Sequence, residues 1–161
     1  AAMEGPLNFL GNLKATELRD HFGAELNVPV KTSGAYILVA RDGVEFKYPR
    51  GESQVYYIGK AGGPGHGLRN RLRTHSKNIL KARNVGADCI HTPVAAYGAA
   101  FGKYFSYVRL ADTEFESPRE LEIQLMARFA KKYGSLPVAN NSGEWDKIRK
   151  AIDLCGTNTQ T

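Results

Sequence analysis

Two tyrosines occupy similar places in two short apolar segments of the chain. Tyr36 lies in residues 34–39 and Tyr57 in residues 56–60, and both segments are rich in β-branched and aromatic residues. Such segments, bounded by Gly, Pro, Asp and Ser, are typical of strands. If the two strands pair antiparallel, the two phenol groups lie close together near one end of the hairpin. A phenol has a pKa of about 10, so it needs nearby positive charge before it can act as a base.

A basic segment at 68–83 supplies that charge. An α-helix advances about 100° per residue, which brings four apolar side chains into one buried stripe. These four are Leu68, Leu72, Ile79 and Ala82. Arg71 and His75 are four residues apart and share the flank of this stripe, where they face the tyrosine hairpin. Each alone is more simply a surface arginine or a partly buried histidine, but together with two tyrosines they favour a reactive site.

A carboxylate completes the set. Ser117, Pro118 and Glu120 form an N-cap, an N1 proline and a capping box, so we expect a helix from there to about Tyr133, ended by Gly134. Glu120 has a capping task, whereas Glu122 has none. Glu122 falls near the middle of the apolar face formed by Leu121, Leu125, Met126, Phe129 and Tyr133. A carboxylate there is costly unless it is paired or binds a metal, so we expect a salt bridge to Arg71, a Mg²⁺ ligand, or both in one site.

Further polar residues surround these five. Lys60 directly follows the second tyrosine segment and is placed to contact phosphate or water. After the 118–133 helix the chain leaves an asparagine, Asn140 or Asn141, beside the core. The other basic residues of the 68–83 segment form a solvated face. Their contacts with a phosphate backbone would position the DNA without reading its sequence. The residues of this face taken as DNA contacts are Arg69, Arg73, Lys77 and Lys81.

Composition sets the bounds on the partner and the compartment. The chain has 161 residues, 42% of them hydrophobic, which is enough for one domain with a real core. A net charge of +6 and a pI near 9.4 favour an acidic partner, nucleic acid before an anionic membrane. No transmembrane run or signal-peptide pattern occurs. Cys89 and Cys155 are far apart in the sequence, and no Cys-x-x-Cys motif is present. We therefore expect both to be free thiols in a reducing cytoplasm. A zinc site formed by Cys89 and His91 is not expected.

The elements that must position these residues follow in order. Residues 1–33 are expected to form an arm with one helix at 16–22 that packs on the core. Within the 34–141 core we expect a turn at 42–43, a short strand at 44–48, a turn at 49–53 and a third sheet strand at 104–110. Residues 84–103 have no clear assignment. Residues 142–161 are expected to form a last amphipathic helix, with Trp145, Ile148 and Ile152 on one face, and a disordered polar tail after Gly156.

The glycine-rich loop at 62–67 offers another interpretation. It follows a strand and opens a helix, as phosphate-binding loops do. It lacks both the Gly-x-x-x-x-Gly-Lys-Ser/Thr and the Gly-x-Gly-x-x-Gly patterns, so nucleotide binding through this loop is a weak alternative.

The pieces Gly34-Ala35-Tyr36 and Tyr57-Ile58-Gly59, followed by Arg71, Glu122 and Asn140, resemble the GIY-YIG nuclease domain in order and spacing. Alanine replaces isoleucine in the first triplet. Pro137-x-x-Asn140 is similar to the family's closing motif, which favours Asn140 over Asn141. Arg71-x-x-x-His75 looks like the arrangement in restriction and some homing endonucleases of the family. The resemblance covers roughly residues 34–141.

This resemblance implies an α+β fold of the α/β/α sandwich type, with a small three-stranded antiparallel sheet flanked by helices. It also implies Mg²⁺-dependent hydrolysis of phosphodiesters in double-stranded DNA, with Mn²⁺ as a substitute metal and Glu122 as the metal ligand. By analogy with the restriction members, Tyr36 is expected to be the general base and His75 to take or share its proton. Tyr57 would bind the water or the phosphate, and the two tyrosines could exchange roles. Arg71 would stabilise the phosphoryl charge, and Asn140 would hold the geometry.

Several functions stay open from the sequence. The leading hypothesis is a restriction-type endonuclease, acting either as a homodimer on DNA or as successive monomers. A structure-specific repair or recombination nuclease and a catalytically inactive DNA-binding module are the alternatives. A basic RNA- or membrane-binding domain also fits the composition, but it explains neither Glu122 nor the tyrosine pair.

Overall fold

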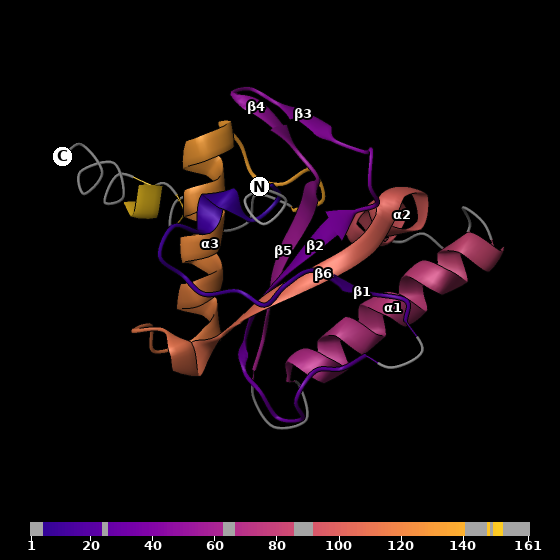
Figure 1. Ribbon diagram of the computed structural model, residues 1–161, viewed down its shortest axis with the longest axis horizontal. Helices are drawn as coiled ribbons and strands as arrows, with labels where there is room; N and C mark the ends of the chain where they lie inside the picture. The colour runs from indigo at the N-terminus through magenta and orange to yellow at the C-terminus, as the bar shows by residue number, and fades with distance from the viewer. Residues whose placement is uncertain are drawn as a thin grey trace.

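Strand β2 (Gly34–Ala40) forms the centre of the fold and is buried along its whole length. In the computed structural model, which describes residues 5–23, 26–62, 67–85, 92–140, 148 and 150–152, β2 pairs antiparallel with β5 (Val55–Ala61) and with β6 (Gly102–Arg109). A short strand β1 (Arg19–Asp20) pairs with the outer side of β6. The sheet order is therefore β1-β6-β2-β5, and the sheet is antiparallel throughout (Figure 1).

Two of our predictions about this sheet are wrong. The sheet has four strands rather than three, and the fourth comes from residues 16–22, which were expected to be helical. The backbone N–H of Thr16 donates to the carbonyl of Tyr107 at 3.0 Å, and that of His21 donates to the carbonyl of Lys103 at 2.7 Å. The edge of β6 would otherwise present unpaired backbone groups. Pairing with that edge overrides the local helix preference of the arm.

Helices cover both faces of the sheet, which gives the expected mixed α+β sandwich (Figure 1). Helix α3 (Pro118–Tyr133) packs on one face, where Ala35, Ile37 and Val39 point. Helix α1 (Leu68–Val85) packs on the other face, against Tyr36 and Leu38. Helix α2 (Pro93–Phe101) lies beside α1 on that side. All four residues of the predicted α1 stripe are buried.

A β-bulge in β5 changes the face of the sheet to which its side chains point. The register of β2 and β5 pairs Leu38 with Tyr57 and then Val39 with Val55, so Tyr56 is the extra residue. Tyr56 and Tyr57 consequently both belong to the α1 side, and Val55 packs with Ile58 on the α3 side. Strict alternation along β5 would put Tyr57 on the same face as Val55, and the bulge interrupts that alternation.

The ends of the helices follow from local sequence. The Ser117 hydroxyl accepts from the backbone N–H of Glu120 at 3.1 Å, and Gly134 ends α3 with φ of 87°. Glu120 reaches one residue beyond the cap and accepts from the N–H of Glu116 at 2.9 Å. Helix α2, which we did not assign, begins at Pro93 with the Thr92 hydroxyl as its cap. Its cap and N1 proline were the signal that the sequence analysis missed.

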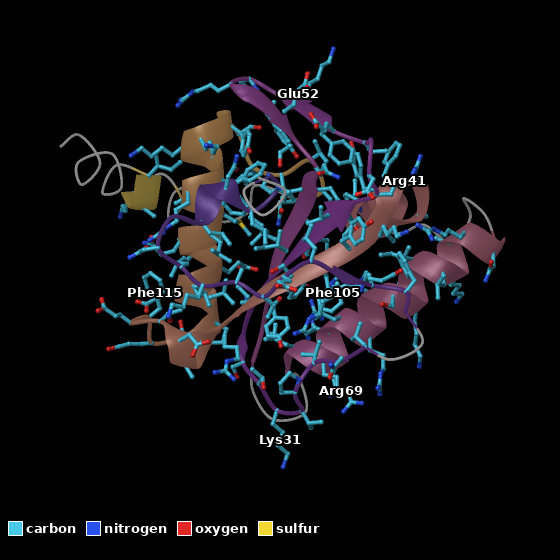
Figure 2. All side chains as sticks on the ribbon, viewed as in Figure 1. Lys31, Arg41, Glu52, Arg69, Phe105 and Phe115 are labelled. Atoms are coloured by element: carbon cyan, nitrogen blue, oxygen red, sulfur yellow. The ribbon has the colours of Figure 1, made fainter. Side chains whose placement is uncertain are left out.

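A separate ribbon projects from one end of the sheet (Figure 1). Strands β3 (Phe46–Tyr48) and β4 (Gly51–Ser53) form it, so the predicted turn at 49–53 is confined to its first two residues. The Tyr48 hydroxyl ties the ribbon to the core, because it donates to the carbonyl of Val55 at 2.8 Å and accepts from the N–H of Val138 at 3.1 Å. Figure 2 shows Glu52 on this ribbon, at the opposite end of the molecule from Arg69 of α1.

The chain ends add to the α3 side of the core. The first described residues include a 3₁₀ turn, Asn8–Leu10, in which Phe9 and Leu10 are buried. A second 3₁₀ turn, Leu110–Asp112, follows β6. Residues 148 and 150–152 are helical and Ile148 is buried. Trp145, the polar tail, Asn141, His91 and both cysteines lie outside the described residues. Within the described part of the chain, no helix has the length and apolar character needed to cross a membrane.

Candidate active site

Three rings meet on the α1 side of the sheet. The centroid of the Tyr36 ring lies 6.1 Å from that of Tyr57 and 5.3 Å from that of His75, and Tyr57 and His75 are 5.6 Å apart. The strand register sets this arrangement, because Tyr36 lies opposite Gly59 and Leu38 opposite Tyr57, which brings the two phenols onto one face. Helix α1 contributes the buried His75 from above that face. The sequence prediction that the two tyrosines and His75 gather in one place is confirmed.

The glycine of the second tyrosine segment is required by this packing. The ring of Tyr36 crosses β5 directly over Gly59, and a Cβ added there would collide with the Cζ and hydroxyl of Tyr36. Any other residue at position 59 would therefore push the phenol away from its place. Gly59 is required because a side chain there would occupy the space of the Tyr36 ring, and not because of its backbone conformation.

The Tyr36 hydroxyl is hydrogen-bonded to His75. Its oxygen lies 2.6 Å from Nε2 of His75, and the whole Tyr36 side chain has no solvent exposure. Burial, the largest cause, raises the pKa of Tyr36 well above its usual value, and Arg71 opposes this by charge and hydrogen bonding. Burial lowers the pKa of His75 to about 4, with a smaller contribution from the Arg71 charge. At neutral pH the phenol is protonated and the imidazole is neutral, so in the Nδ1–H tautomer of His75 the Tyr36 hydroxyl donates and Nε2 accepts.

Tyr57 is the partly exposed member of the three. Burial first, and then the charge of Glu122, raise the pKa of Tyr57, whereas Arg71 and a hydrogen bond with Tyr36 lower it. The ring of Tyr57 packs beside that of Tyr36, which is hydrogen-bonded to His75. Of these three side chains, Tyr57 is the one that reaches the surface.

That surface is a depression of about 300 Å³. Side chains from three elements line it: Tyr57 and Lys60 of β5, Arg71 of α1 and Glu122 of α3. Because α1 and α3 cover opposite faces of the sheet, the depression lies where both helices reach the edge strand β5. Four of the seven predicted catalytic residues, Tyr57, Lys60, Arg71 and Glu122, therefore line one depression. Tyr36 and His75 are buried beside Tyr57, and Asn140 bonds the backbone of β5.

Glu122 is half-buried and opens into this depression. Its neighbours on α3, Leu121 and Leu125, are fully buried. We had placed the carboxylate near the centre of the apolar face, and the structure instead brings it to the border of that face with the depression. The difference arises because the face extends past the edge of the sheet at β5.

Asn140 stabilises the edge of β5. Its Oδ1 accepts from the N–H of Ile58 at 2.9 Å, and its Nδ2 donates to the carbonyl of the same residue at 2.8 Å. The N–H of Ala139 donates to the carbonyl of Tyr56 at 2.9 Å. These bonds pair three outer backbone groups of the strand that carries Tyr57 and Lys60, as a neighbouring strand would. Asn140 acts through backbone position and does not line the depression.

The donor set at the depression fits one kind of metal. Among the described residues, no cluster of three or more His, Cys, Asp or Glu side chains is present. A zinc site with its three or four protein ligands therefore does not fit here. Mg²⁺ usually keeps several waters and uses one or two carboxylates together with substrate phosphates. A single, accessible Glu122 beside Lys60 and Arg71 fits that pattern.

Of the four basic residues predicted to contact DNA, two line a cavity. Arg69 and Arg73 line this second cavity, between α1 and residues 21–23 and 26–28 of the arm. Lys77 and Lys81 are exposed further along α1. The same arm carries a buried histidine, His21, that the sequence analysis did not single out. Burial first, and then the charge of His75, lower the pKa of His21 to about 3.

Comparison with protein-family models, curated proteins and solved structures finds no match for this chain. The function therefore has to be argued from the geometry of these residues.

Proposed function

We propose that this chain is a metal-dependent DNA endonuclease with a GIY-YIG-type active site. The observation that carries the proposal is the cluster of Tyr57, Tyr36 and His75, in which the Tyr36 hydroxyl is hydrogen-bonded to His75 and Tyr57 faces a depression lined by Arg71, Lys60 and Glu122. Phosphodiester hydrolysis needs an acceptor for a water proton, positive charge at the phosphoryl group and help for the leaving oxygen. The depression offers a group for each need.

The acceptor is a relay of neutral groups. The proton of the attacking water passes to the Tyr57 oxygen, the Tyr57 proton passes to Tyr36, and the Tyr36 proton passes to Nε2 of His75. Each oxygen gains one proton as it loses another, so neither phenol carries a full charge during the transfer. At pH 7 both phenols are protonated and the imidazole is neutral, so Nε2 can accept the proton in the Nδ1–H tautomer. Tyr36, named as the base by the family resemblance, becomes the middle of the relay.

The cationic side chains bind and stabilise the phosphate. Arg71 is always charged and can bond two phosphoryl oxygens at once. Lys60 faces the same depression and supplies a second positive charge. Mg²⁺ held by Glu122, or Mn²⁺ in its place, would stabilise charge on the phosphate and on the leaving 3′ oxygen.

The proposed substrate is double-stranded DNA. The net charge of +6 supports an anionic polymer as partner, and His75 four residues after Arg71 supports a sequence-specific, restriction-type enzyme within the family. Double-strand cleavage of a palindrome would use two copies of the chain or two successive cuts.

The test is digestion of supercoiled plasmid and phage DNA with Mg²⁺, beside EDTA, Glu122→Ala and Glu114→Ala. Glu114 is an exposed carboxylate before α3 and serves as the matched control. We expect discrete fragments from the wild type and Glu114→Ala, and none with EDTA or Glu122→Ala. Nicking or smearing with the same controls would favour the structure-specific alternative. DNA binding without cleavage of linear, supercoiled or branched DNA would overturn the proposal in favour of the inactive binding module.

A further inference from the structure

A second cavity, separate from the depression, lies between α1 and the arm. It has a volume of about 450 Å³, within the range of about 300–1,000 Å³ that ligand pockets occupy. Arg69 and Arg73 are one helical turn apart and both line it, whereas Arg71 points about 200° away around the helix. Helix α1 therefore separates two cationic sites. Figure 2 shows Arg69 at the end of α1 beside the arm.

Arg69 and Arg73 supply positive charge to this cavity. None of its lining residues within the described part of the chain is acidic. The Nε of Arg69 is buried and has no hydrogen-bond partner among the described residues, and the same holds for Nε2 of His21, whose side chain is 1% exposed. Asp20, the neighbouring carboxylate, instead accepts from the N–H of Phe22 at 2.8 Å. Two guanidinium groups with no carboxylate among the described residues of the cavity wall favour an anionic ligand.

The rest of the cavity wall is apolar or neutral. Leu80 is 41% exposed, which is unusual for a large aliphatic side chain in this chain, and it lines the cavity together with Leu26 and Val28. Asn27 and Ser76 add hydrogen-bonding groups. A free phosphate would leave the apolar wall in water. A ligand with an anionic group and a flat, weakly polar part would cover both.

We infer that the cavity between the arm and α1 binds a nucleotide unit, with its phosphate on Arg69 and Arg73 and its base against Leu80 and the arm. The nucleotide is either free or part of a nucleic-acid strand. The cavity binds it whether or not the depression is catalytic, and only the case in which the strand is the substrate rests on the proposed function.

The experiment is calorimetric titration of the full chain with 2′-deoxynucleoside 5′-monophosphates in EDTA, beside inorganic phosphate and deoxynucleosides. We expect at least one mononucleotide to bind at least about tenfold more tightly than phosphate or its own nucleoside. Arg73→Ala and Arg69→Ala should each weaken it by about tenfold or more, the usual size of a lost bond to a charged group. Leu80→Glu should do the same by repulsion and keeps both arginines. Lys47→Ala removes an equal charge on the exposed ribbon and should change nothing.

The two sources of the nucleotide are separated by competition. Displacement of the mononucleotide by duplex or single-stranded DNA would assign the cavity to a strand, and simultaneous binding of both would assign it to a free nucleotide. The inference is overturned if no mononucleotide binds, if the Arg69, Arg73 and Leu80 variants bind like the wild type, or if Arg71→Ala abolishes binding. Loss of DNA cleavage in Glu122→Ala is measured separately, so either proposal can fail without the other.

Discussion

At the scale of single residues, the site depends on how one phenol is held. Tyr36 is fully buried, bonded to His75 and pressed against Gly59, so it has little freedom to move. Its motif suggests a group that contacts the water, yet Tyr57 is the tyrosine that reaches the depression. The residue types were predictable from the sequence. Which phenol is buried and which faces the depression was not, because that depends on which of them helix α1 covers.

Gly59→Ala tests this packing. The added methyl group would occupy the place of the Tyr36 ring, so either the strand or the ring must shift. We expect a loss of stability of about 1–3 kcal/mol, the usual cost of overpacking, and a fall in the cleavage rate of about 100-fold, because a displacement of about 1 Å in an active site has effects of that size. Urea unfolding and single-turnover cleavage measure the two effects. Wild-type values in both would show that Tyr36 is not fixed by position 59.

At the scale of elements, the edge of β5 is stabilised by a side chain in place of a strand. Asn140 bonds both backbone groups of Ile58, next to Tyr57 on the strand. Asn140→Ala should leave both groups without their partner and cost about 1–3 kcal/mol, with a loss of cleavage from misplaced Tyr57. Asn84→Ala, at an exposed asparagine of α1, is the matched control.

Asn140→Asp tests the same hydrogen bonds with a side chain of nearly the same shape that carries a negative charge. The aspartate keeps the acceptor for the Ile58 N–H but cannot donate to the Ile58 carbonyl when ionised. We expect it to behave like Asn140→Ala in urea unfolding. If Asn140→Ala were as stable as Asn84→Ala but inactive, Asn140 would have to take part in chemistry directly.

The elements also show where sequence patterns suffice. The caps of α3, the stripe of α1 and the central strands follow from local signals, and these elements carry Tyr36, Arg71, His75 and Glu122. Strand β1 and the bulge at Tyr56 do not, because both arise from pairing between distant segments. The arm has a local helix preference that the free edge of β6 overrides. Sequence patterns therefore predicted the side with the Tyr57 depression better than the cavity on the arm.

At the scale of the whole molecule, two buried histidines link folding to pH. The pKa of His75 is about 4 and that of His21 about 3, against an ordinary value near 6.5. Between pH 6.5 and 4 the unfolded chain binds more protons than the folded one, so stability falls as the pH falls. Each histidine contributes up to about 1.4 kcal/mol per pH unit in that window and nothing above it.

Urea unfolding at several pH values between 7 and 4 measures this loss, and proton NMR titration assigns it. The imidazole signals of His21 and His75 should stay in their neutral positions down to about pH 5. In His21→Asn the slope of stability against pH should be shallower than in the wild type. Titration of both rings near 6.5 would contradict the burial of these histidines as neutral groups.

The most direct measurement of the central claim is the single-turnover rate of Mg²⁺-dependent DNA cleavage by Tyr57→Phe, beside Tyr97→Phe. Tyr57→Phe removes only the hydroxyl that would receive the water proton in the proposed relay, whereas Tyr97 packs against Phe46 and Phe101, away from the depression. The relay predicts a loss of about 100-fold or more in Tyr57→Phe, in line with general-base contributions of about 10²–10⁴, with DNA binding retained and Tyr97→Phe unchanged. Wild-type cleavage by Tyr57→Phe would contradict the relay and with it the assignment of this depression as the active site.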